Sequence, residues 1–160
     1  MPAVWLAGAD DAEVVAKLIR EFRDWYGRNR PSDESVAASV RRLLADPDTD
    51  FLLAAEAEGA PPAGVWALRY RHSIWMGADD CWLEDLFVRG SAQGRGLGNA
   101  LVAAAVDRAR ERGCRRVELD VDEGNAAARA LYQRLGFTEH AKTDPPERTL
   151  FIARYLDQDD

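Results

Sequence analysis

Two hydrophobic periodicities alternate along the chain and predict its elements. In some segments apolar residues recur every three or four positions, as on one face of an amphipathic helix, and between them lie short apolar runs typical of strands. Helices are predicted at residues 10–27, 31–47, 97–112 and 126–135. Strands are predicted at residues 3–6, 51–57, 64–72, 81–88, 116–121, 137–140 and 149–155. About seven strands with four helices in this order predict a mixed sheet covered on both faces, an α/β-type fold.

Length and composition indicate one globular domain. The chain has 160 residues, of which 47% are hydrophobic and 31% are charged. These values are ordinary for a protein with a substantial core. No repeat and no low-complexity linker interrupts the sequence. We therefore expect residues 1–160 to form a single domain.

Charge and rare residue types argue against several classes of function. The net charge of −7 disfavours non-specific binding to nucleic acid. No apolar run approaches about 18 residues, so no membrane span is expected, and the N-terminus lacks the pattern of a signal peptide. Cys81 and Cys114 are far apart and are interpreted as buried thiols in a reducing, cytoplasmic environment. His72 and His140 have no paired partner in the sequence, so no metal site is expected.

A glycine-rich turn separates the predicted strand 81–88 from the next helix. Its three glycines occupy alternate positions, Gly94, Gly96 and Gly98. A helix that starts after such a turn directs free backbone N–H groups and the positive end of its dipole toward one point, which favours an anion. A P-loop is excluded because the turn has no lysine, and a dinucleotide fingerprint is excluded because Asn99 replaces its last glycine. The remaining pattern, Gln93-x-x-Gly96-x-Gly98, is by itself also compatible with a connector that binds nothing.

This pattern resembles the pyrophosphate-binding motif of the GCN5-related N-acetyltransferase (GNAT) superfamily, and the predicted order of elements is similar to that fold along the entire chain. The resemblance implies an enzyme that uses acetyl-CoA as co-substrate, bound where the sheet splays between its fourth and fifth strands. It also implies that residues 86–88 pair with the pantetheine arm and that residues 94–99 cradle the pyrophosphate. The implied cofactor-binding residues are Leu86, Phe87, Val88, Gln93, Gly94, Arg95, Gly96, Leu97, Gly98, Asn99, Asn125 and Ala128. Relatives in this superfamily are commonly dimers, so a homodimer is a further expectation.

A second motif surrounds Tyr132. Asn125, Ala128 and Tyr132 are spaced three and four residues apart and share a helix face. The residues alone are also compatible with an ordinary asparagine cap and a core tyrosine. The pattern N-x-x-A-x-x-x-Y-x-x-x-G-F closely resembles the GNAT segment whose tyrosine protonates the departing CoA thiolate. The resemblance therefore implies that Tyr132 is the general acid.

Two adjacent acids, Glu84 and Asp85, lie inside the predicted strand 81–88. Alternation of side chains along a strand places the two acids on opposite faces. On the face of Glu84 it also places Trp82, Leu86 and Val88. A carboxylate in a central strand is costly unless it is paired, solvated or used in chemistry. Glu84 therefore either meets water where the strand leaves the sheet or takes part in catalysis.

The segment around these acids resembles a narrower group. LEDLFV, preceded by SIWMG, is similar to the diamine (spermidine/spermine) acetyltransferases. One departure is Gly124, where that group usually has an aromatic residue. An amine must lose a proton before it attacks, and Glu84 is the candidate base that accepts it through water. The candidate substrate-binding residues are Glu84, Asp85, Trp25 and Tyr26, with Arg69 and Tyr70 as further walls of the acceptor site.

The predicted function is transfer of an acetyl group from acetyl-CoA to a primary amine of a small cationic acceptor, either a diamine or polyamine or a lysine-like molecule. Two alternatives stay open. One is a related acetyltransferase for an aminoglycoside, an amino acid or a protein N-terminus. The other is a non-catalytic sensor that binds acyl-CoA, against which the presence of both Glu84 and Tyr132 counts.

Overall fold

The computed structural model describes residues 1–156 and contains one five-stranded sheet. Its strands are β1 (Ala3–Leu6), β2 (Thr49–Ala55), β3 (Gly64–Ser73), β4 (Ala78–Val88) and β5 (Arg116–Glu118). Its helices are α1 (Ala12–Trp25), α2 (Asp33–Leu44), α3 (Leu97–Glu111) and α4 (Ala126–Arg134). Short 3₁₀ turns at Ala9–Asp11 and Gly90–Ala92 precede α1 and α3. None of the helices in residues 1–156 combines the length and the apolar character that a membrane crossing requires.

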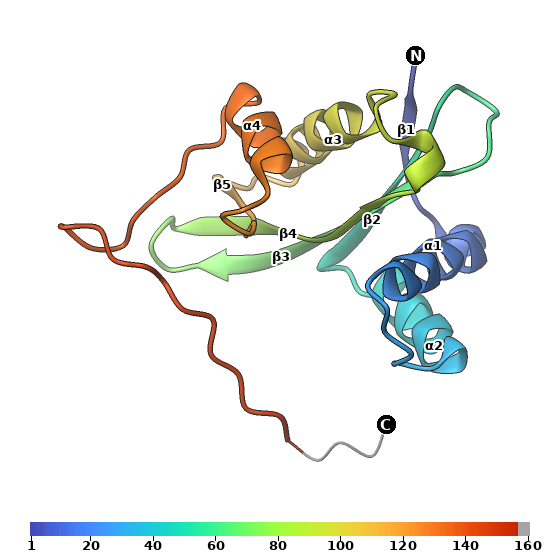
Figure 1. The fold of residues 1–160 in the computed structure, drawn as a ribbon, viewed down its shortest axis with the longest axis horizontal. Helices are drawn as coiled ribbons and strands as arrows, with labels where there is room; N and C mark the ends of the chain where they lie inside the picture. The colour runs from blue at the N-terminus through green and yellow to red at the C-terminus, as the bar shows by residue number, and fades with distance from the viewer. Residues whose placement is uncertain (157–160) are drawn as a thin grey trace.

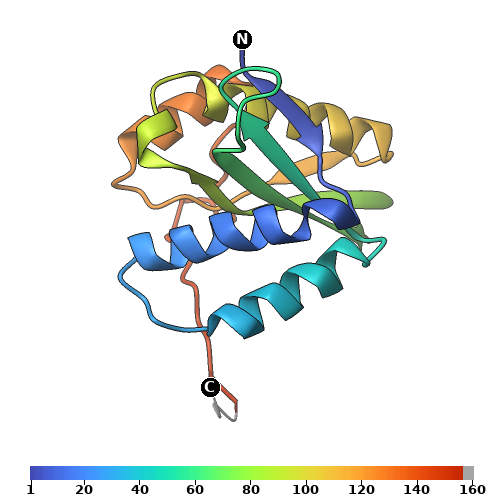
Figure 2. The ribbon, with the colours of Figure 1, turned by 90° about the vertical axis from the view of Figure 1, so that its right-hand side faces the viewer.

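The strands lie in the sheet in the order of the chain, from β1 to β5. Neighbours are antiparallel except β4 and β5, which are parallel because the chain returns through α3 before it forms β5. Figure 1 and Figure 2 show α1 and α2 on one face of the sheet and α3 and α4 on the other. The prediction of a mixed α/β sheet with helices on both faces is therefore confirmed.

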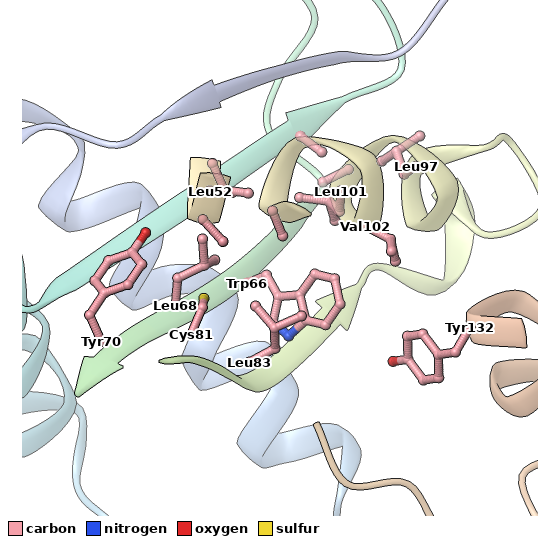
Figure 3. Close-up of a cluster of buried hydrophobic side chains, with 14 of the residues drawn as sticks. Leu52, Trp66, Leu68, Tyr70, Cys81, Leu83, Leu97, Leu101, Val102 and Tyr132 are labelled. Atoms are coloured by element: carbon pink, nitrogen blue, oxygen red, sulfur yellow. The ribbon is translucent and has the colours of Figure 1, made fainter. Parts of the chain in front are cut away.

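Alternation along β3 divides the core between these two faces. Val65 and Ala67 belong to the buried cluster under α1 and α2, whereas Trp66 and Leu68 belong to the cluster under α3. Figure 3 shows this second cluster, in which Leu101 of α3 lies over the sheet. Each fully buried side chain of this size contributes about 1.5–3 kcal/mol through the apolar surface that it removes from water. The two clusters hold β3, and with it the neighbouring β4, in a defined orientation.

The two C-terminal strands predicted at residues 137–140 and 149–155 are not formed in the part of the chain that the structure describes. The sheet therefore has five strands instead of seven. After α4 the described chain runs as an irregular segment (Figure 1). Phe151 in this segment is 93% exposed. The apolar pattern of a strand is present, but a strand also needs a neighbouring backbone that takes up its hydrogen bonds.

Candidate active site

β4 and β5 pair over a short stretch and then separate. Their parallel register begins with Asp80 opposite Arg116 and ends with Trp82 opposite Glu118. β5 stops there, short of its predicted end at residue 121, while β4 continues to Val88. A pocket of about 300 Å³, here named the splay pocket, lies where the two strands part. It is lined by Trp66, Trp82, Leu83, Glu84, Asp85, Leu86, Leu119, Asp120, Tyr132 and Phe151.

A β-bulge in β4 sets the direction of the side chains at this pocket. Asp85 has a left-handed φ of 59°, and the register between β3 and β4 shifts between Val65 and Ala67. The bulge accommodates one extra residue in β4, which reverses the alternation of side chains beyond it. Phe87 accordingly packs in the cluster under α1 and α2, and Leu86 packs against the cluster under α3.

The predicted grouping of Glu84 with Leu86 and Val88 on one face is therefore wrong. Glu84 lies opposite Ala67 and contacts Arg69, on the face of α1 and α2, whereas Leu86 and Val88 pack on the α3 side. Strict alternation holds only while every residue of a strand is paired, and the extra residue of a bulge ends it.

Glu84 is held by one ion pair and lies at the junction of two pockets. Arg69 Nη1 donates a hydrogen bond of 2.8 Å to Glu84 Oε1. The other oxygen, Oε2, accepts no hydrogen bond from the residues that the structure describes. Glu84 and Trp82 line both the splay pocket and a second pocket of about 360 Å³, here named the Arg69 pocket. The Arg69 pocket is lined by Asp46, Asp48, Arg69, Tyr70, Arg71, Trp82 and Glu84.

Tyr132 reaches the splay pocket from α4. Asn125 caps this helix, because its side chain accepts the N–H of Ala128 at 3.2 Å. Tyr132 is 9% exposed, and its ring centroid lies 6.4 Å from that of Trp66, toward which its hydroxyl points in Figure 3. Burial first, and Asp120 second, raise the pKa of Tyr132 above its ordinary value of 10.0. The phenol therefore stays protonated at neutral pH and is able to donate a proton.

Three carboxylates line the splay pocket: Glu84, Asp85 and Asp120. Desolvation raises the pKa of Asp85, the charges of Glu84 and Asp120 add to the rise, and Arg69 opposes it. Asp85 is nevertheless exposed to solvent, so the rise in its pKa is smaller than that of a fully buried carboxyl group. No group of three or more His, Cys, Asp or Glu side chains in residues 1–156 is arranged to hold a metal ion.

The glycine-rich turn between β4 and α3 has the geometry of an anion cradle. Gly94 and Gly96 have left-handed φ angles of 76° and 84°, a conformation that favours glycine. The first hydrogen bond of the helix runs from Ala100 N to Gly96 O at 3.1 Å, so the N–H groups of residues 97–99 precede the helical ladder. Gln93 braces the turn, since its Nε2 donates to Val88 O at 3.1 Å. Free donors at a helix start, beside glycines that leave the backbone uncovered, fit a phosphate.

Comparison of the sequence with known protein families identifies the family to which these splayed strands, this glycine-rich turn and this buried tyrosine belong. Residues 15–137 match the Acetyltransferase (GNAT) family. The chain belongs to this family. The resemblance predicted from the turn and from the segment of Tyr132 is thus confirmed, and with it the enzyme class, an acetyl-CoA-dependent N-acetyltransferase.

Individual relatives are similar to this GNAT chain over most of its length. A mycothiol acetyltransferase of Beutenbergia cavernae is 42% identical over 150 residues, with 82% of this chain and 50% of the relative covered. A thialysine N-epsilon-acetyltransferase of Bos taurus is 31% identical over 137 residues, with 79% of this chain and 78% of the relative covered. A crystal structure from Arthrobacter sp. FB24, assigned to the acetyltransferases, has 32% identity and a TM-score of 0.81, with 96% of both chains covered.

The chain spans about half the length of the mycothiol acetyltransferases that it matches. The relatives carry the names of mycothiol and thialysine acetyltransferases, and neither name states a diamine acceptor. The narrower resemblance to the diamine acetyltransferases therefore stays a prediction.

Two predicted substrate-binding residues of this GNAT chain, Trp25 and Tyr26, line neither pocket. They lie at the end of α1, are 69% and 55% exposed, and pack on Phe22, whose ring centroid is 5.3 Å from that of Phe87. They thus share a face of the sheet with Glu84 without contributing to its pockets.

Other strands and loops supply the remaining walls. Arg69 and Tyr70, named from the sequence as walls of the acceptor site, do line the Arg69 pocket, together with Arg71 of the same strand. Asp120 and Arg71 were missed from the sequence. Asp120 lies two residues beyond the end of the parallel strand β5, where functional side chains collect, but the predicted strand 116–121 concealed this position. Arg71 has no comparable local signal.

Proposed function

We propose that residues 1–160 act as one N-acetyltransferase domain that moves the acetyl group of acetyl-CoA to a primary amine of a small cationic acceptor, a diamine, polyamine or lysine-like molecule. The observation that carries this proposal is the position of Glu84 at the junction of two pockets, one of which also holds Tyr132. A base between two cavities and an acid within one of them suit a transfer between two bound substrates.

In this proposal the splay pocket and the glycine-rich turn bind the donor, acetyl-CoA, which supplies the acetyl thioester. Residues 86–88 pair with the pantetheine arm through their backbone, residues 93–99 hold the pyrophosphate, and Asn125 and Ala128 lie beside the donor. The free N–H groups at the start of α3 support this assignment.

The acceptor must lose a proton before it reacts, because an alkylamine has a pKa of about 10.4 and is an ammonium ion at neutral pH. Glu84 accepts this first proton, directly or through a water molecule. The amine nitrogen then forms a bond to the thioester carbonyl carbon, and a backbone N–H near residues 87–88 stabilises the negative oxygen.

The carbon–sulfur bond then breaks and the sulfur keeps the electron pair. Tyr132 gives the thiolate a proton. The attacking nitrogen loses its second proton to solvent, and solvent returns a proton to Tyr132. The proton on Glu84 returns to water, so one ammonium and one thioester yield one N-acetylamine, one CoA thiol and one free proton. A thiol has a pKa of about 8.5, so its thiolate is a good leaving group and needs only modest acid catalysis by Tyr132.

Release of CoA thiol from acetyl-CoA in the presence of a panel of amines tests the proposal. The panel contains putrescine, spermidine, lysine analogues, neutral amines of similar size, aminoglycosides and peptide N-termini. We expect thiol release with the cationic small amines. Strong release with aminoglycosides or peptides alone contradicts the proposed acceptor and leaves acetyl transfer intact, whereas binding of acetyl-CoA without release from any amine supports the sensor.

The similarity to mycothiol acetyltransferases makes the acceptor of those enzymes a further member of the panel. The homodimer and the cytoplasmic location stay predictions. Light scattering after gel filtration measures the oligomeric state, and a mass close to the 17.8 kDa of one chain would contradict a dimer.

A further inference from the structure

The Arg69 pocket has both signs of charge on its walls. Asp46 and Asp48 come from the loop before β2, and Glu84 comes from β4. Arg69 and Arg71 come from β3. A pocket for an acceptor that carries only positive charges needs no guanidinium group among its walls, and this pocket has two.

The two arginines differ in how many of their N–H donors already bind other protein groups. Arg69 donates to Glu84 at 2.8 Å. The Arg71 side chain makes no hydrogen bond with any residue of the described chain. It forms a long ion pair, with Nη2 3.6 Å from Glu118 Oε1, and its guanidinium carbon lies 5.9 Å from the centroid of the Trp82 ring. The Arg71 side chain is 67% exposed. A guanidinium offers five N–H donors in a planar fork that matches a carboxylate, so Arg71 has donors left for a ligand.

The register of β3 and β4 sets the spacing between Arg71 and the proposed base. Ala67 is opposite Glu84 and Arg71 is opposite Asp80, with Arg69 between them on the same face of β3. Four residues along a strand correspond to about 13 Å between backbone positions, and the two side chains shorten the gap that a ligand must span. Lysine carries its amine on a flexible four-carbon stem, so an extended lysine-like molecule suits this gap.

We infer that the acceptor carries a carboxylate as well as the reacting amine, so that it is lysine-like and zwitterionic instead of a diamine or polyamine. Its carboxylate binds Arg71, its reacting amine lies at Glu84, and its second ammonium group faces Asp48, which is exposed in the same pocket. A diamine in this position would bring its second positive charge toward Arg71, and such a like-charge contact discriminates against it. This inference rests on the proposed function, because Glu84 must mark the place where the amine reacts.

Three acceptors that differ at one group test the inference. Lysine has the carboxylate, lysine amide replaces it by a neutral amide, and cadaverine lacks it altogether. Thiol release gives kcat/KM for each, and we expect lysine to exceed each of the other two by about tenfold or more, the range of a hydrogen bond to a charged group. Arg71→Gln should remove most of this advantage while cadaverine keeps its rate or gains. Arg71→Lys, which keeps the charge and loses the fork, should be intermediate.

Arg110→Gln is the matched control, because Arg110 is an exposed arginine of α3 that lines neither pocket. It should leave the preference for lysine unchanged. Equal kcat/KM for lysine and cadaverine in the wild type overturns the inference, and so does a preference for lysine that Arg71→Gln leaves intact. Thermal unfolding checks that each variant is folded. If Arg71→Gln is not folded, Arg71→Lys alone is used for the test.

A failure of the proposed function is distinguishable from a failure of this inference. If no amine releases thiol, the proposed function fails, and calorimetry of lysine and cadaverine in the presence of CoA tests the pocket by itself. Tighter binding of lysine that is lost in Arg71→Gln supports the carboxylate site, and equal binding of lysine and cadaverine overturns it.

Discussion

Arg69 Nη1 lies 2.8 Å from Glu84 Oε1, in a pair that joins β3 and β4 directly beside the bulge at Asp85. Both side chains are about one-third exposed, at 38% and 33%, so the pair contributes little to stability. Its effect is orientation: one oxygen of Glu84 is held, the other accepts no hydrogen bond within residues 1–156, and the side chain lines both pockets. A positioned carboxylate with one free oxygen is what a base in this place requires.

Glu84→Gln should lower turnover with every amine by roughly 100-fold or more, because the amide keeps an oxygen for Arg69 and loses the basic oxygen. Thiol-release kinetics with saturating acetyl-CoA measure it. Glu21→Gln is the control, since Glu21 forms a similar ion pair with Arg89, at 2.9 Å and 32% exposure, outside both pockets. Equal turnover of the two variants would return Glu84 to a structural role.

The same variant should weaken the preference for cationic over neutral acceptors, because it removes one negative charge from the Arg69 pocket. In the wild type this preference should shrink as salt rises, since exposed charges are screened beyond about 8 Å at physiological ionic strength. kcat/KM for a cationic and a neutral amine at low and high salt measures the effect. A preference that does not change with salt would argue against electrostatic selection.

Tyr132→Phe should reduce turnover by roughly 10- to 1,000-fold and leave acetyl-CoA binding nearly unchanged, because it removes the hydroxyl and keeps the packing against Trp66. Single-turnover kinetics and calorimetry separate the two quantities. Tyr155→Phe, at an exposed tyrosine outside both pockets, is the control. Turnover of Tyr132→Phe at the level of the wild type would leave Tyr132 as a core residue.

Gly96→Val should weaken acetyl-CoA binding at least about tenfold, because a side chain enters the proposed pyrophosphate cradle. The φ of 84° at Gly96 also makes the variant strained, so a strain control is needed. Gly59→Val supplies it: Gly59 has a φ of 79° in the connection between β2 and β3, with no atom within 4 Å of an added Cβ. Calorimetry should show weaker binding in Gly96→Val only, and equal affinities would remove the cradle from the site.

Asp85→Asn should stabilise the fold more at neutral pH than below pH 3.8. The raised pKa of Asp85 means that the folded state binds its proton more tightly than the unfolded chain, so stability falls as pH rises from the ordinary 3.8 through the folded pKa. Asparagine removes this loss, and its preference for a left-handed φ adds a gain that does not depend on pH. Thermal unfolding of both proteins at the two pH values measures the difference, and an equal gain at both would contradict the shift.

The parts of this protein that the sequence determined are local in the chain. The helical faces, the glycine-rich turn from Gln93 to Gly98 and the segment from Asn125 to Tyr132 each depend on residues within a few turns of one another. Such patterns can be recognised from the spacing of residues in the sequence, because helix propensity, helix caps and left-handed glycines act over a few residues. They were sufficient for the family and for the order of the four helices and the five strands that form.

What surrounds Glu84 was decided by the tertiary structure. Nothing in the apolar pattern of LEDLFV marks the extra residue at Asp85, because a bulge arises from the register between two strands and not from one strand alone. Arg71 and Asp120 come to the pockets through pairing with other strands, and no spacing in the chain relates them to Glu84. The residues 149–155 show the converse: their pattern is that of a strand, but pairing requires a partner backbone, which no local pattern supplies.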